Sequence, residues 1–183
     1  MRICSPVAVA IALAGCGDTP EIVCDGRQDT ELGTGDSVYL ALDNGDKMPI
    51  FDGPQGGSHV YVAVEACNID GPIDVRYTVF DDTLGQFIAS ADYGRRPLRP
   101  SQRCCGTAVG LQGFLAVPSP TTTTPTDTGY TYSYGGGIAS DLDGHELTIV
   151  ATVVDAAGEQ FQMTRQYVGS DAGVESGSSS FGK

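Results

Sequence analysis

Alternation of apolar and polar residues is clearest in the stretch 53–67, where a Gly-Pro and Gly-Gly cluster precedes a regular pattern. Val60, Val62 and Val64 occupy one face of an extended segment, and the residues between them occupy the other. Successive side chains of a strand point to opposite faces, so this pattern predicts a half-buried strand entered from a tight turn. Residues 73–80 alternate in the same way. We expect these two strands to supply the centre of the core.

The same reasoning places other short strands along the chain, separated by turn-forming residues. Strands are predicted at residues 37–42, 48–51, 86–93, 146–155 and 159–168, with one or two irregular strands at 106–117. In the first of these Val38, Leu40 and Leu42 share a face, and the Asn-Gly turn at 43–46 is typical of a hairpin. Phe161 and Met163, with Tyr167, are candidate core residues. Short strands without helical periodicity predict an all-β fold, an antiparallel β-sandwich.

The first fifteen residues differ from the rest, because a positive charge at Arg2 is followed by an apolar run that ends at Leu13. This is the pattern of a secretory signal peptide. The run is too short to span a bilayer, although an uncleaved anchor or a buried helix is the alternative. Residues 13–16, Leu-Ala-Gly-Cys, resemble a bacterial lipobox. The resemblance implies cleavage before Cys16 and lipidation of its sulfur.

The composition of residues 16–183 predicts a tether, a domain with a long loop, and a tail. We expect a polar tether at residues 16–35 and a β-sandwich domain at 36–169. The segment 118–137 is rich in Thr, Pro and Gly and is predicted to be a long surface loop within that domain. The Ser/Gly-rich tail, residues 170–183, is predicted to be disordered.

The strongly negative net charge of the chain excludes some classes of partner. The formal net charge is −13, with 23 acidic residues against 10 Lys and Arg. Such a chain repels nucleic acids and anionic lipid surfaces, so we expect no nucleic-acid partner. The membrane contact we expect is the N-terminal lipid.

Four of the six cysteines remain once Cys4 leaves with the signal peptide and Cys16 carries lipid. An even number outside the cytoplasm predicts two disulfides. We favour pairing of Cys24 and Cys67 with Cys104 and Cys105, one to each, over a vicinal Cys104–Cys105 bridge. A zinc site is less favoured, since adjacent cysteines cannot easily both bind one tetrahedral ion.

Two resemblances to bacterial envelope proteins follow from local patterns. The pattern at residues 144–158 resembles the last hairpin of immunoglobulin-like or cadherin-like bacterial surface domains. The Leu-Gly-Thr-Gly stretch at 32–35, with 42–46 and the Gly-Pro-Gln-Gly-Gly-Ser-His motif at 53–59, resembles uncharacterised lipoproteins of myxobacteria and related bacteria. That resemblance implies a lipoprotein setting and an immunoglobulin-like sandwich, and no catalytic residue. A true immunoglobulin domain is not supported, because the chain has no Trp.

Candidate metal ligands are few. Asp141, Asp143 and Glu146 supply the carboxylates that Ca²⁺ prefers, but their spacing departs from a full EF-hand loop. His59, on the face opposite the valines, is a candidate copper or zinc ligand together with His145. Solvated turn carboxylates and a histidine at the rim of the turn are the alternatives. We expect no cofactor, and calcium at these carboxylates is the alternative.

Two further groups are candidate contact residues. Arg95, Arg96 and Arg99 concentrate positive charge in the loop predicted at 94–103, and either grip an anionic partner or pair with the protein's own carboxylates. Tyr130, Tyr132 and Tyr134 project to one side of an extended segment. They are candidates for contact with a protein or glycan, or for an edge strand over the core.

No catalytic signature stands out. The sequence lacks a Gly-x-Ser-x-Gly motif, and Ser58 and His59 are neighbours with no orienting acid identified. The sequence therefore predicts a lipid-anchored, outer-membrane lipoprotein that acts as a non-enzymatic binding, adhesion or envelope-structural module. A periplasmic cation-binding protein is the alternative, and a hydrolase comes third.

Overall fold

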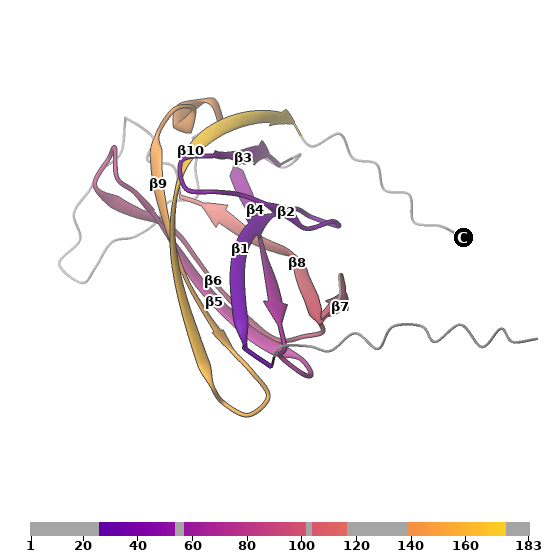
Figure 1. Cartoon of the computed structure of the whole chain (residues 1–183). Coiled ribbons are helices and arrows are strands. Elements are labelled where there is room, and N and C mark those ends of the chain that lie inside the picture. Colours follow the sequence, from indigo (N-terminus) through magenta and orange to yellow (C-terminus); the bar gives the residue numbers. More distant parts are fainter. Residues whose placement is uncertain (1–25, 54–56, 102–103, 117–138, 175–183) are drawn as a thin grey trace, which may run out of the picture.

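The alternating segments form one long, curled sheet in a computed structural model, which describes residues 26–53, 57–101, 104–116 and 139–174 (Figure 1). In chain order the elements are β1 (Asp29–Thr34), β2 (Leu40–Ala41), β3 (Lys47–Asp52), β4 (Ser58–Cys67), β5 (Ile73–Asp81), β6 (Gln86–Arg96), β7 (Arg99–Pro100), β8 (Cys105–Leu115), the 3-10 helix η1 (Ala139–Leu142), β9 (Glu146–Val154) and β10 (Gln160–Val174). Among these elements, no helix is long and apolar enough to cross a membrane.

The sheet curls into two facing layers. One layer contains β7, β8, β4 and β1 with the short β2, and the other contains β10, β9, β5 and β6. The link between them is β3, which pairs antiparallel with the start of β4 and parallel with the end of β10. All other pairings are antiparallel. This strand order is that of an immunoglobulin-like sandwich, so the predicted fold class is confirmed.

Alternation places the core between the layers. The inward residues of β4, including Val60, Val62 and Val64, face those of β5 and β9 and are fully buried. The two best strands of the sequence thus meet across the core from opposite layers, and they are not hydrogen-bonded neighbours. Met163 and Tyr167 are buried and Phe161 is partly buried, as predicted.

The two layers are also tied together by polar contacts. The hydroxyl of Tyr77 on β5 donates to the carbonyl of Leu111 on β8 at 2.9 Å. At the next strand, the Tyr93 hydroxyl donates to the carbonyl of Gln112. These bonds hold β5 and β6 against β8 where no sheet ladder joins them.

The two ends of the sandwich carry different loops. The start of β1 pairs with the end of β4, so the chain enters the sandwich at the end that holds the β4–β5 loop and the β9–β10 turn. At the opposite end lie the β5–β6 turn, η1 and the last residues of β10. Figure 1 shows these ends as the bottom and the top of the sheet. We call them the entry end and the far end.

The strand predicted at 37–42 is wrong. Only Leu40–Ala41 pairs, with β1, and the Val38 and Leu40 side chains are 66% and 56% exposed. The reason is that Tyr39 turns inward over Gly33, where an added Cβ would lie 2.7 Å from the tyrosine ring. The turn at 43–46 joins β2 to β3, which do not pair with each other, so the hairpin predicted there is also wrong.

Three predicted boundaries need correction. The tether predicted at 16–35 is wrong over Asp29–Thr34, because β1 pairs along β4. The disordered tail predicted from residue 170 is wrong as far as Val174, because β10 continues there beside β3. The loop predicted at 94–103 is interrupted by the end of β6 and by β7. The signal peptide, the loop at 118–137 and the rest of the tail lie outside the described residues.

Candidate functional site

A disulfide fastens the entry end of the sandwich. Cys67 and Cys105 are register partners on β4 and β8, and their sulfurs are bonded. This confirms one of the favoured pairings and excludes the vicinal bridge. Cys104 is disulfide-bonded as well, and Cys24 lies outside the described residues. A disulfide of this kind is typical of proteins outside the reducing cytoplasm.

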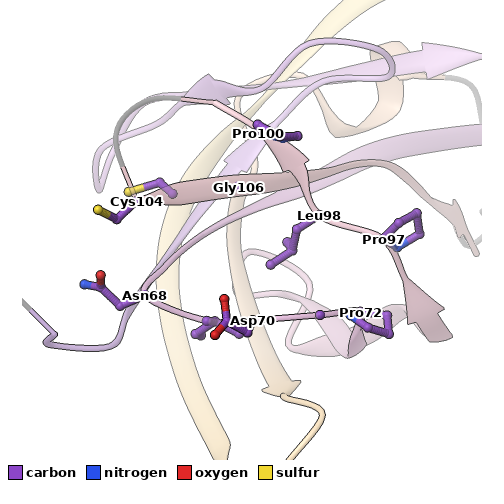
Figure 2. Close-up of a pocket in the computed structure, with 11 residues that line it drawn as sticks. Asn68, Asp70, Pro72, Pro97, Leu98, Pro100, Cys104 and Gly106 are labelled. Atoms are coloured by element: carbon purple, nitrogen blue, oxygen red, sulfur yellow. The ribbon is translucent and has the colours of Figure 1, made fainter. Parts of the chain in front are cut away.

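An open hollow of about 770 Å³ lies beside this disulfide (Figure 2). Figure 2 shows the β4–β5 loop with Asn68, Asp70 and Pro72 on one side and Pro97, Leu98 and Pro100 on the other. Leu98 packs over Gly106 of β8, where an added Cβ would lie 2.8 Å from its own Cβ. The lining is mainly proline, leucine and backbone, with Asp70 as its acidic side chain.

Arg95, Arg96 and Arg99 neighbour the lining residues of this hollow in sequence, and each makes a different contact. The Arg96 guanidinium lies 4.9 Å from the centre of the Tyr93 ring. Arg99 donates to the carbonyl of Ser37 at 3.4 Å. Arg95 has a positive φ of 50°, and its backbone N–H donates to Asp74. Partner binding by these residues stays a prediction.

His59 is buried, which contradicts the alternative that it is an exposed histidine at the rim of the turn. Its side chain lies on the outer face of β4 among Phe51, Tyr61 and Phe114, with ring centroids 5.1 to 6.2 Å away. Neighbouring Ser58 donates its hydroxyl to Asp52 at 2.9 Å. Because adjacent strand residues point to opposite faces, Ser58 and His59 do not form a nucleophile and base pair.

The carboxylates proposed for calcium lie in and after η1. Asp143 accepts a hydrogen bond from the backbone N–H of Asp171 at 3.1 Å, while Glu146 donates its own N–H to Thr83. Among the described residues, no group of three His, Cys, Asp or Glu side chains is placed to hold a metal ion. Calcium binding by Asp141, Asp143 and Glu146 stays a prediction, as does copper or zinc binding by His59.

Asp81 and His145 form a pair that the sequence did not indicate. Asp81 is fully buried at the end of β5, and its two oxygens accept from Leu84 N at 3.0 Å and contact His145 Nδ1 at 2.9 Å. The pair joins the β5–β6 turn to the turn before β9. Sequence reasoning missed it because 64 residues separate the partners. The one signal in the sequence was the position of Asp81, a carboxylate directly after the alternating apolar residues of 73–80.

Replacement of Asp81 by Ala should lower the free energy of unfolding by about 2 to 3 kcal/mol, since the contacts of a fully buried carboxyl group with Leu84 N and His145 are lost. Asp81→Asn keeps an acceptor for Leu84 N and should cost less. Thermal unfolding followed by circular dichroism measures both. Equal melting temperatures for wild type and Asp81→Ala would show that the pair contributes nothing to stability.

Comparison with known proteins gives distant similarities alone. No known protein family and no curated protein matches the chain. Similar solved structures include the periplasmic chaperone SfaE, with a TM-score of 0.32, 8% identity and coverage of 80% of this chain. The chain spans 59% of that chaperone chain.

Two further structures are similar at the same level. The CooA pilin subunit from enterotoxigenic Escherichia coli has a TM-score of 0.34 and 11% identity, covering 75% of this chain and 95% of the pilin. Northeast Structural Genomics Consortium target SoR45 has a TM-score of 0.31 and 7% identity, covering 82% and 90%. Similarities this distant carry no argument about function.

Proposed function

We propose that the chain is an extracytoplasmic lipoprotein, anchored through Cys16 to the outer membrane, whose sandwich is a non-enzymatic binding or envelope-structural module. The observation that carries the proposal is the disulfide-fastened entry end. A disulfide between Cys67 and Cys105 belongs in an oxidising compartment, and the lipobox-like residues 13–16 precede β1 by a short segment.

The proposal also bounds the distance of the sandwich from the bilayer. The residues between Cys16 and Asp29 span at most about 45 Å when extended, so the entry end would lie within that distance of the membrane. The side-chain amide of Asn68 donates to the carbonyl of Arg27, which holds the incoming chain against the β4–β5 loop.

The non-enzymatic part rests on the geometry of the described side chains. The Ser58 hydroxyl donates to Asp52, and His59 lies among aromatic rings. Both carboxyl oxygens of the buried Asp81 are in contact with a partner, one with Leu84 N and the other with His145. The open hollow at the entry end is lined mainly by apolar and backbone groups, with Asn68 and Asp70 as its polar side chains. These features favour a surface that contacts a partner.

Replacement of Cys16 by Ser tests the anchor. We expect wild-type cells fed radiolabelled palmitate to yield a labelled protein of mature size, and Cys16→Ser to yield an unlabelled, uncleaved precursor. Cys4→Ser is the matched control, because Cys4 lies within the predicted signal peptide, and it should be labelled normally. Absence of label from wild type, or label that persists in Cys16→Ser, would overturn the proposal. Protease added to intact cells then reports which side of the outer membrane the domain occupies.

A further inference from the structure

The outer face of the layer formed by β10, β9, β5 and β6 has an unusual composition. Twelve of its outward residues form three rows that cross all four strands, and Asp74, Val154 and Gln160 continue the same face toward the entry end. The rows are Gln162, Thr152, Arg76 and Asp92; then Thr164, Val150, Thr78 and Ser90; then Gln166, Thr148, Phe80 and Phe87. All of these residues are at least partly exposed. We call the surface of these three rows the Thr-rich face.

The Thr-rich face carries no net formal charge on a protein whose net charge is −13. Its charged residues are Arg76 and Asp92, which form an ion pair at 2.8 Å. At its margin Asp82 accepts a hydrogen bond from Thr148. An anionic ligand would be repelled by the rest of the protein, and a cationic one would be drawn to the acidic surface elsewhere. The partner that matches this face is uncharged and polar.

The surface combines hydrogen-bonding groups with an exposed aromatic pair. Ser, Thr and Gln side chains both donate and accept hydrogen bonds. A shallow hollow of about 380 Å³ is lined by the Arg76–Asp92 pair, Thr78, Ser90 and Thr152 among others. Beside it, the Phe80 and Phe87 rings meet edge to face at 5.0 Å, and Phe87 is 57% exposed. Hydroxyl-rich rings with one apolar face fit such a combination.

The area of the Thr-rich face indicates whether its partner is a small extended ligand or a second copy of the chain. Four strands about 4.8 Å apart and five residues of about 3.3 Å each give a footprint of roughly 300 Å². A stable protein interface buries about 800 Å² on each partner. The Thr-rich face is therefore small for a dimer and sufficient for several rings of an oligosaccharide.

We infer that the Thr-rich face binds a neutral polysaccharide, with the sugar hydroxyls bonded in the hollow and a ring packed on Phe87. The inference rests on the proposed function, since it names a ligand class for the same binding module. It requires nothing of the hollow at the entry end.

Affinity electrophoresis of the full, detergent-purified protein tests the inference. Native gels would contain laminarin, mannan, xylan or dextran, with dextran sulfate as the anionic comparison. We expect retardation by at least one neutral polysaccharide and none by dextran sulfate. Phe87→Ala should weaken the affinity about fivefold to tenfold, because an aromatic contact is lost. Thr78→Val, which removes one hydroxyl from the hollow at nearly constant volume, should weaken it as well.

Leu84→Ala is the matched control, because Leu84 is 46% exposed in the adjacent turn and lies outside the rows. It should bind as wild type does, and melting curves confirm that each variant is folded. No retardation in any neutral gel overturns the inference, and so does retardation that Phe87→Ala and Thr78→Val leave unchanged. A dimer that sedimentation detects and Phe87→Ala abolishes would assign the face to a second copy instead. Palmitate labelling is independent of these results, so failure here leaves the anchor proposal standing.

Discussion

Removal of the Cys67–Cys105 disulfide should destabilise the protein more than any exposed substitution. The bond joins residues 38 apart in sequence. Closing a loop of that length removes conformational entropy from the unfolded chain worth about 4 kcal/mol. In a protein of this size that corresponds to a fall in melting temperature of roughly 8 to 16 °C. The double variant Cys67→Ala/Cys105→Ala measures this without leaving a free thiol at the site.

The location of the bond adds a local effect. Next to it, the N–H of Asn68 donates to the carbonyl of Cys104 at 2.8 Å, so the β4–β5 loop is held at the rim of the hollow. Hydrogen exchange should therefore rise in residues 68–72 of the double variant before it rises in β9. Reduced wild type should be at least as unstable as the double variant. A double variant that melts within 2 °C of wild type would show that the strand ladder alone fixes this end.

The disulfide could be anticipated because the sequence shows a secretory signal pattern and leaves an even number of cysteines after it. The strands β4 and β5 could be anticipated for a similar reason, since a buried face repeats every second residue. Val38 and Leu40 show where that reasoning fails. Their alternation is regular, but Gly33 leaves room for the ring of Tyr39, and the apolar neighbours of Tyr39 are exposed.

The Thr-rich face could not be predicted from sequence at all. Its rows bring together residues 76–80, 87–92, 148–152 and 162–166, and each segment alone shows ordinary polar positions of a strand. Only the register makes them one surface, because a shift by one residue would send every side chain to the other face. The same holds for Asp81 and His145, whose meeting depends on the pairing of β5 with β9.

Tyr77 is expected to be the most important single side chain in the core. It is 2% exposed, and its hydroxyl crosses from β5 to the Leu111 carbonyl on β8. Burial raises its pKa well above the ordinary value for tyrosine, so the phenol remains a donor. Tyr77→Ala should cost about 3 to 5 kcal/mol of unfolding free energy, as other large-to-small core changes do. Tyr77→Phe keeps the ring and should cost about 1 to 2 kcal/mol.

Gly113 on β8 provides the sharper form of this test. A Cβ at Gly113 would lie 2.5 Å from the Tyr77 hydroxyl oxygen, so Gly113→Ala should displace the ring and destabilise the wild-type protein. In the Tyr77→Ala background that conflict is gone, and the added methyl group partly fills the space. The two changes should therefore be non-additive, with a coupling of about 1 to 3 kcal/mol in a double-mutant cycle by chemical denaturation. Additive costs would show that the ring of Tyr77 does not lie on Gly113.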